Sequence, residues 1–208
     1  RPMARVIEPL SMMGALIDSY ESKPPLSITG NQKLSAINYT LPVASAQIKS
    51  SLLLAGLYAE GETCIVENST TRDHTERMLR GFGYPVKTSN GQISLMGGGE
   101  LHACDIEVPS DISSAAFFIV AASIAKEADI TLSAVNINPT RTGILEILAL
   151  MGAKITLTDE RVVAGELVAD IRVCSAELRG INIPQELVPL SIDEFPVIFI
   201  AASCATGE

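Results

Sequence analysis

A repeat of 69 residues constrains this chain more than any other feature. A short pattern, Leu-x-x-Met-Gly or Leu-x-x-Phe-Gly followed by strand-like apolar residues, occurs three times. Its glycines are Gly14, Gly83 and Gly152, so both steps are 69 residues. Each copy is typical of an amphipathic helix that ends at a glycine and is followed by a strand, because glycine readily adopts the conformation that stops a helix.

A second recurring feature is a polar start that leads into a stretch with no polar face. The three stretches, with their polar starts, are Ser45–Gln47 before Leu52–Ala59, Asp111–Ser114 before Ala115–Ala125, and Asp193–Pro196 before Val197–Ala205. A helix that is apolar all round is predicted to be buried on all sides. We therefore expect three buried helices whose N-terminal ends face something polar, where free N–H groups and the helix dipole favour anions. Ordinary core helices with polar caps are the alternative.

Strand-like segments alternate with these helices between the glycines. In chain order they are residues 26–29, 36–41, 63–67, 92–96, 105–108, 130–133, 155–158, 171–174 and a short segment near Ile181. Each repeat thus contains strands, one amphipathic helix and one buried helix. The expected fold class is α/β or α+β, built from repeated units.

Composition and charge exclude several classes of protein. The 208 residues carry a net charge of −9 without a basic cluster, which disfavours nucleic-acid binding. No apolar run reaches the roughly 20 residues that span a membrane. The four cysteines form no C-x-x-C pair, so we expect reduced thiols in a reducing compartment rather than a zinc site or a disulfide scaffold. Since the chain opens on Arg1 and stops in mid-pattern, we expect it to be part of a longer protein.

Basic residues recur in register with the repeat. Arg72 and Arg141 are 69 residues apart, both precede an amphipathic helix, and Arg1 occupies the same part of the first copy. A local ion pair is the alternative for each arginine, but the recurrence favours a shared face. Together with the Ser45–Gln47 head and Asp193, such a face suits a small polyanion such as a phosphorylated carboxylate. A carboxylate there could act as a general base toward a bound hydroxyl.

Five segments resemble those of the 5-enolpyruvylshikimate-3-phosphate synthase family, in the same order over essentially the whole chain. They are RPM at Arg1–Met3, PVASAQIKS at Pro42–Ser50, TRDHTERML at Thr71–Leu79, NPTRTG at Asn138–Gly143 and IDEFP at Ile192–Pro196. The resemblance implies a two-domain inside-out barrel, each domain built of three βαβαββ units with buried parallel helices and outer sheets. It implies that residues 1–109 belong to the first substrate-binding domain and residues 110–208 to the second.

The resemblance also implies an activity. The family transfers the enolpyruvyl group of phosphoenolpyruvate to the 5-hydroxyl of shikimate 3-phosphate and releases phosphate, in aromatic amino-acid biosynthesis. By this resemblance we expect a cytoplasmic transferase that is a monomer at full length. No metal or organic cofactor and no nucleic-acid or membrane partner is implied.

Residue roles follow from the matching motifs. The residues implied to hold shikimate 3-phosphate are Ser45, Ala46, Gln47 and Arg72. Gln47 would also approach phosphoenolpyruvate, which Arg1 would contact. Asp193 would accept the proton of the attacking hydroxyl.

The chain departs from the family pattern in ways that bear on activity. Some members have Ser-Ser-Gln at the Ser45–Gln47 position and lack an arginine at the Arg72 position; this chain resembles the branch noted for tolerating the herbicide glyphosate. The N-terminal lysine motif, the Asn-Ser-Gly-Thr-type loop and the C-terminal Lys-Glu-Ser-Asp-Arg-type motif are absent. We therefore expect this chain alone to be inactive.

Two other functions stay open at this point. The first is the enolpyruvyl transferase that acts on UDP-N-acetylglucosamine and shares the fold, although the segments at 138–143 and 192–196 argue against it. The second is a non-catalytic anion-binding module made of repeats, which the missing motifs favour for the chain alone. A similarly folded RNA-processing relative is disfavoured by the net charge of −9.

Overall fold

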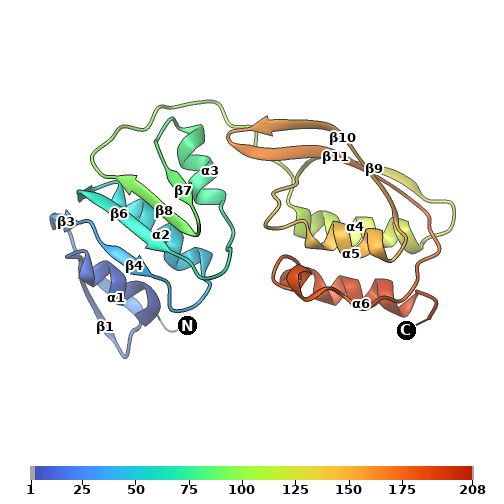
Figure 1. Cartoon of the computed structure of the whole chain (residues 1–208), viewed down its shortest axis with the longest axis horizontal. Coiled ribbons are helices and arrows are strands. Elements are labelled where there is room, and N and C mark those ends of the chain that lie inside the picture. Colours follow the sequence, from blue (N-terminus) through green and yellow to red (C-terminus); the bar gives the residue numbers. More distant parts are fainter. Residues whose placement is uncertain (1–2, 208) are drawn as a thin grey trace. The chain divides into compact units, whose positions relative to one another are not determined.

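A computed structural model of the chain describes residues 3–207 and divides into two compact units, Arg1–Cys104 (unit 1) and Asp105–Glu208 (unit 2) (Figure 1). The elements of unit 1 are α1 (Ala4–Met12), β1 (Leu16–Tyr20), β2 (Lys23–Thr29), β3 (Leu34–Ser35), β4 (Asn38–Thr40), α2 (Ala46–Gly56), β5 (Ala59–Glu60), β6 (Glu62–Val66), α3 (His74–Gly81), β7 (Lys87–Ser89) and β8 (Gln92–Met96). Those of unit 2 are α4 (Ile112–Ile124), β9 (Asp129–Asn136), α5 (Gly143–Leu150), β10 (Lys154–Val163), β11 (Glu166–Cys174), the 3-10 turns η1 (Gln185–Leu187) and η2 (Ile192–Glu194), and α6 (Phe195–Ser203).

The main sheet of unit 1 has four strands in the order β4-β6-β8-β7. Strands β4 and β6 are parallel and are joined by α2, whereas β8 is antiparallel to both β6 and β7. Helix α3 leads from β6 into the β7–β8 hairpin. This order of elements is one βαβαββ unit. It is preceded by α1 and the antiparallel pair β1–β2, and a short parallel pair, β3–β5, lies beside it.

Unit 2 repeats this plan. Its sheet has the order β10-β11-β9, and α5 leads from β9 into the β10–β11 hairpin. The place of β4 is taken by Ser110, which forms a single parallel bridge with Val135 of β9. A second such bridge, between Arg179 and Thr206, flanks α6. The predicted fold class of repeated βαβαββ units is confirmed.

Similar backbone hydrogen bonds recur close to the 69-residue period in the first two copies. Leu41, Ser110 and Arg179 occupy equivalent positions of the three copies, before α2, α4 and α6, and are 69 positions apart. The N–H of Leu41 donates to the carbonyl of Val66 at 2.8 Å, and that of Ser110 to Ala134 at 2.7 Å. Because only single bridges form at Ser110 and Arg179, the predicted strands at 105–108 and near Ile181 are wrong.

The repeat glycines end their helices as predicted. Gly14, Gly83 and Gly152 have φ values of +100°, +78° and +93°. After α5, the N–H of Gly152 donates to the carbonyl of Ala149 and that of Ala153 to Leu148, both at 2.9 Å. This pair of bonds is the Schellman motif, which satisfies the last carbonyls of a helix. The same pair follows α1 and α3.

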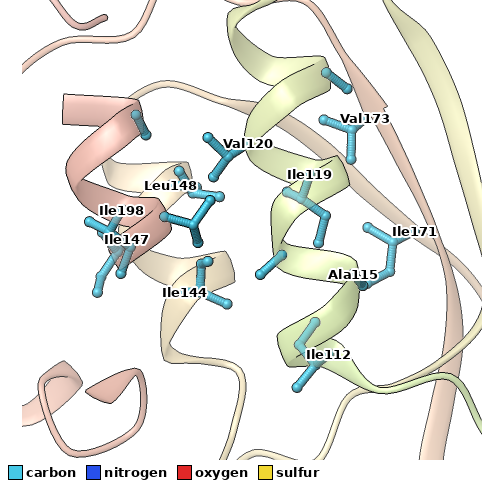
Figure 2. Packing of buried hydrophobic residues seen from close by; sticks show 14 of the residues in the cluster. Ile112, Ala115, Ile119, Val120, Ile144, Ile147, Leu148, Ile171, Val173 and Ile198 are labelled. Carbon is cyan, nitrogen blue, oxygen red and sulfur yellow. The ribbon is translucent and has the colours of Figure 1, made fainter. Parts of the chain in front are cut away.

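The core of unit 2 is centred on α4, which lies between the sheet and the other helices (Figure 2). Figure 2 shows Ala115 and Ile119 beside Ile171 and Val173 of β11, with Val120 directed to the opposite side. All five side chains are buried. Unit 1 has its own core, in which α2 packs on β6, β8 and α1.

The three apolar helices are nevertheless not buried on every side. Their large exposed side chains are Leu54 on α2, Phe117 and Phe118 on α4, and Phe199 and Ile200 on α6, each between 51% and 62% exposed. The prediction of complete burial is wrong for this chain, because each helix is covered by its own sheet or by one neighbouring helix but not all round. Over residues 3–207, no helix is both long enough and apolar enough to cross a membrane.

Candidate functional site

The first turn of α2 carries three of the predicted site residues. Ser45 is the N-cap, in an extended conformation, and its hydroxyl accepts a hydrogen bond from the N–H of Ile48 at 3.4 Å. Ala46 is the first residue of the helix, and Gln47 is exposed. Arg5 of α1 donates to Oε1 of Gln47 at 2.6 Å, which leaves the amide N–H groups of Gln47 directed away from that bond.

The order of the strands places Arg72 at the edge of the unit 1 sheet where α2 begins. Because β4 and β6 are parallel and joined by α2, the start of α2 lies at the carboxyl ends of both strands. Residues 67–73 leave β6 at this edge, and they carry the half-buried Arg72. The structure thus brings the Ser45–Gln47 turn and the Arg72 segment to one edge, as the shared-face prediction requires of unit 1.

A buried lysine that the sequence analysis missed links these two segments. Lys49 of α2 is fully buried, and its Nζ lies 3.1 Å from Oε2 of Glu67 and 2.8 Å from Oε1 of Glu76. The same ammonium group donates to the carbonyl of Thr71 at 3.4 Å. One signal was available: Lys49 is the single charged residue of α2 and lies in its first turns.

Asp193 lies in unit 2, in the 3-10 turn η2 directly before α6. Its side chain is exposed, whereas the neighbouring Glu194 is buried. The carboxylate of Glu194 accepts a hydrogen bond from the Ser113 hydroxyl, which in turn accepts one from Arg141. Asp193 is therefore held next to a fixed polar network at the start of a helix.

Arg141 forms local ion pairs, which was the alternative role considered for each arginine of the repeat. Its Nη2 is 3.4 Å from Oδ1 of Asp111 and 3.9 Å from Oε1 of Glu194. Two carboxylates thus offset its charge, so it is less suited than the sequence pattern indicated to bind an external anion.

Asp111 caps α4 and is held ionised. Its Oδ2 accepts hydrogen bonds from the N–H of Ser114 at 2.9 Å and from the Ser114 hydroxyl at 3.0 Å. Partial burial would raise its pKa, but these hydrogen bonds and the charge of Arg141 outweigh burial, so the pKa lies below its ordinary value. A carboxylate at this position also complements the positive end of the helix dipole.

Arg1, the predicted phosphoenolpyruvate contact, lies outside the described residues. Within residues 3–207, no group of three or more His, Cys, Asp or Glu side chains is placed to hold a metal ion.

Unit 1 offers a helix N-terminus, a hydroxyl, an amide and a guanidinium group, which suit a phosphate or carboxylate. Unit 2 offers a carboxylate that could accept a proton.

Comparison with known proteins finds relatives that match the whole of this chain. The family model described as EPSP synthase (3-phosphoshikimate 1-carboxyvinyltransferase) matches residues 1–208. A 3-phosphoshikimate 1-carboxyvinyltransferase from Vesicomyosocius okutanii is 66% identical over 208 residues, covering 100% of this chain and 48% of the relative. One from Alkalilimnicola ehrlichii is 61% identical over 209 residues, covering 100% and 47%. The chain spans about half the length of the curated relatives it matches.

Solved structures show the same fold. An EPSP synthase structure from Acinetobacter baumannii superposes with a TM-score of 0.93 at 58% identity, covering 100% of this chain and 47% of that one. The enolpyruvyl transferase NikO from Streptomyces tendae superposes with a TM-score of 0.75 at 15% identity, covering 100% and 50%. The second likeness concerns the fold alone.

Proposed function

Because the chain belongs to the EPSP synthase family, we propose that it contributes substrate-binding and catalytic residues to an enzyme that transfers the enolpyruvyl group of phosphoenolpyruvate to the 5-hydroxyl of shikimate 3-phosphate. The observation that carries this proposal is the edge of unit 1 where the Ser45–Gln47 turn and the Arg72 segment meet. Phosphate is the leaving group of the transfer.

In this proposal, unit 1 binds shikimate 3-phosphate. The free N–H groups at the start of α2 and the Ser45 hydroxyl are donors for the phosphate or ring hydroxyl oxygens. Arg72 supplies a planar fork of donors that matches a phosphate group. Ala46 lies between these groups and contributes its backbone, and Gln47 reaches toward both substrates.

Asp193 is the proposed general base. The 5-hydroxyl loses its proton to a base as its oxygen bonds to the central carbon of phosphoenolpyruvate, whose methylene carbon gains a proton. The bond from the central carbon to the phosphate oxygen then breaks, and a proton leaves the new methyl group to restore the double bond. Asp193 accepts the hydroxyl proton, and fixed cations stabilise the departing phosphate.

Membership of the family is also the basis for the proposed domains, the role of Arg1, the compartment and the oligomeric state. Residues 1–109 are part of the first substrate-binding domain and residues 110–208 part of the second, with Arg1 as a contact for phosphoenolpyruvate. The enzyme acts in the cytoplasm as a monomer. The names of the relatives support shikimate 3-phosphate over UDP-N-acetylglucosamine as the acceptor.

A chimeric enzyme tests this activity. This chain would replace the matching segment of the Acinetobacter baumannii EPSP synthase, and phosphate release would be measured with phosphoenolpyruvate and either acceptor. We expect turnover with shikimate 3-phosphate and none with UDP-N-acetylglucosamine. A folded chimera that uses UDP-N-acetylglucosamine, or neither acceptor, would contradict the proposal.

A further inference from the structure

We infer that Lys49 is a positioning residue that locks the Arg72 segment onto the substrate-binding turn of α2. This inference rests on the proposed function, since it concerns the same half-site for shikimate 3-phosphate. The juxtaposition that carries it is a fully buried lysine between two glutamates from opposite ends of the segment that contains Arg72.

The contacts of Lys49 use all of its donors within the protein. Its ammonium group has three N–H donors, and it faces three acceptors: Glu67 at 3.1 Å, Glu76 at 2.8 Å and the Thr71 carbonyl at 3.4 Å. A lysine is rarely buried completely unless it is paired in this way. Since the side chain is 0% exposed, Lys49 does not reach a ligand directly and acts through its neighbours.

The acceptors belong to the segment between β6 and α3. Glu67 directly follows β6, and Glu76 lies in the first turn of α3. Thr71 is held twice, because its carbonyl accepts from Lys49 and its hydroxyl donates to Glu67 at 2.8 Å. Arg72 is the next residue, so its backbone position follows from this cluster.

Lys49 is also bonded to the turn of α2 that presents Ser45 and Gln47. The N–H of Lys49 donates to the Ser45 carbonyl at 3.1 Å, so Lys49 lies one helical turn after the N-cap. A second link joins the same two segments, since the hydroxyl groups of Ser50 and Thr75 are 2.7 Å apart. The two halves of the proposed phosphate site are therefore fastened to each other through buried polar bonds.

The fixed geometry has a functional reason. A guanidinium group binds phosphate through two parallel hydrogen bonds, which tolerate little misplacement. Without the lock, part of the binding free energy would go into ordering the Arg72 segment. Loss of Lys49 is thus expected to weaken binding of shikimate 3-phosphate.

Lys49→Met alone would leave two buried carboxylates unpaired, and the chain could fail to fold. We therefore choose the triple variant Lys49→Met/Glu67→Gln/Glu76→Gln, which removes every charge of the cluster and keeps the side-chain sizes similar. Ile65→Val is the matched control, because it lowers stability in β6 but leaves the cluster intact. Circular dichroism and thermal unfolding would establish that both variants fold.

The first readout needs no ligand. Backbone order parameters from nuclear magnetic resonance are expected to be about 0.85 at Thr71 and Arg72 in the unmodified chain and in the control. In the triple variant they are expected to fall below about 0.6. The second readout is calorimetric titration with shikimate 3-phosphate. Its dissociation constant is expected to rise about tenfold in the triple variant and to stay unchanged in the control.

The results test the role of Lys49 separately from the proposed function. Unchanged order parameters in the triple variant would overturn the lock, and so would unchanged affinity in a variant whose segment has become mobile. Equal losses of affinity in the triple variant and in the control would assign the effect to stability alone and also overturn it. If the unmodified folded chain does not bind shikimate 3-phosphate, the proposed function fails instead, and the order parameters alone decide whether Lys49 fixes the segment.

Discussion

Ser113, in the first turn of α4, donates a hydrogen bond from its hydroxyl to the carboxylate of Glu194, the residue directly before α6. Glu194 is only 4% exposed. The bond joins the starts of two apolar helices that belong to successive copies of the repeat. It also fixes the backbone next to Asp193, the proposed base.

Replacing Ser113 with alanine is expected to destabilise the chain. The variant leaves the buried Glu194 carboxylate without this donor, which costs about 1–3 kcal/mol. Urea unfolding measures the loss. Ser203→Ala is the control, since Ser203 is exposed and its hydroxyl bonds locally, to the carbonyl of Ile200 and to Sγ of the neighbouring Cys204. Equal stability of Ser113→Ala and the unmodified chain would show that the bond contributes nothing.

Asp193→Asn is expected to reduce turnover far more than substrate affinity. The amide keeps the size of the side chain but cannot accept the hydroxyl proton, and loss of a general base lowers kcat by about 10²–10⁴-fold. In the chimera, KM for shikimate 3-phosphate should change by less than about threefold. Asp18→Asn, at an exposed position of β1, is the control. A kcat for Asp193→Asn within about twofold of the unmodified chimera would refute the base assignment.

The lowered pKa of Asp111 predicts that the free energy of unfolding depends on pH. Its pKa is below the ordinary value in the folded chain, so its ionised form stabilises the fold above the unfolded-state pKa, and this contribution is lost as the pH falls through the folded-state pKa. Asp111→Asn keeps a capping side chain but removes the charge. We expect the variant to be less stable than the unmodified chain above the ordinary pKa of an aspartate, with the difference shrinking as the pH falls through the lowered folded-state pKa. Urea unfolding across this range measures it, and a difference that grows on acidification would contradict the argument.

Gly152→Ala is expected to destabilise the end of α5. The position has φ +93°, and a side chain in the left-handed region costs about 1–2 kcal/mol. A Cβ at Gly152 would meet only the Glu177 carbonyl at 3.6 Å, an ordinary contact, so the cost comes from the backbone rather than from a clash. Gly30→Ala is the control, because nothing lies within 4 Å of its added Cβ and its φ is not positive. Thermal unfolding should separate the two variants.

The features that could be predicted from the sequence are those decided by neighbouring residues. A glycine at the end of an amphipathic helix acts through its own φ, so Gly14, Gly83 and Gly152 revealed both the period and the helix ends. The polar starts before α2 and α4 were visible for the same reason, because a cap bonds to a residue three positions ahead. Ser45 and Asp111 occupy these cap positions.

The features that could not be predicted depend on partners far along the chain. Lys49 pairs with a glutamate 18 residues away, and Arg141 approaches a carboxylate 30 residues away in sequence. Periodicity does not reveal such pairings, so Arg141 was expected on an anion-binding face although carboxylates offset its charge. Likewise, an all-apolar helix pattern predicts that burial is favourable but does not show that Phe117 remains 62% exposed.

The most direct test of the central claim is calorimetric titration of this 208-residue chain with shikimate 3-phosphate, with UDP-N-acetylglucosamine as the control ligand. Arg72→Ala, verified as folded by circular dichroism, is measured in parallel. Our account predicts selective binding of shikimate 3-phosphate and at least about a tenfold loss of affinity in Arg72→Ala, since a charged hydrogen bond is removed. A folded chain that fails to bind shikimate 3-phosphate, or that binds it equally well without Arg72, would contradict the account.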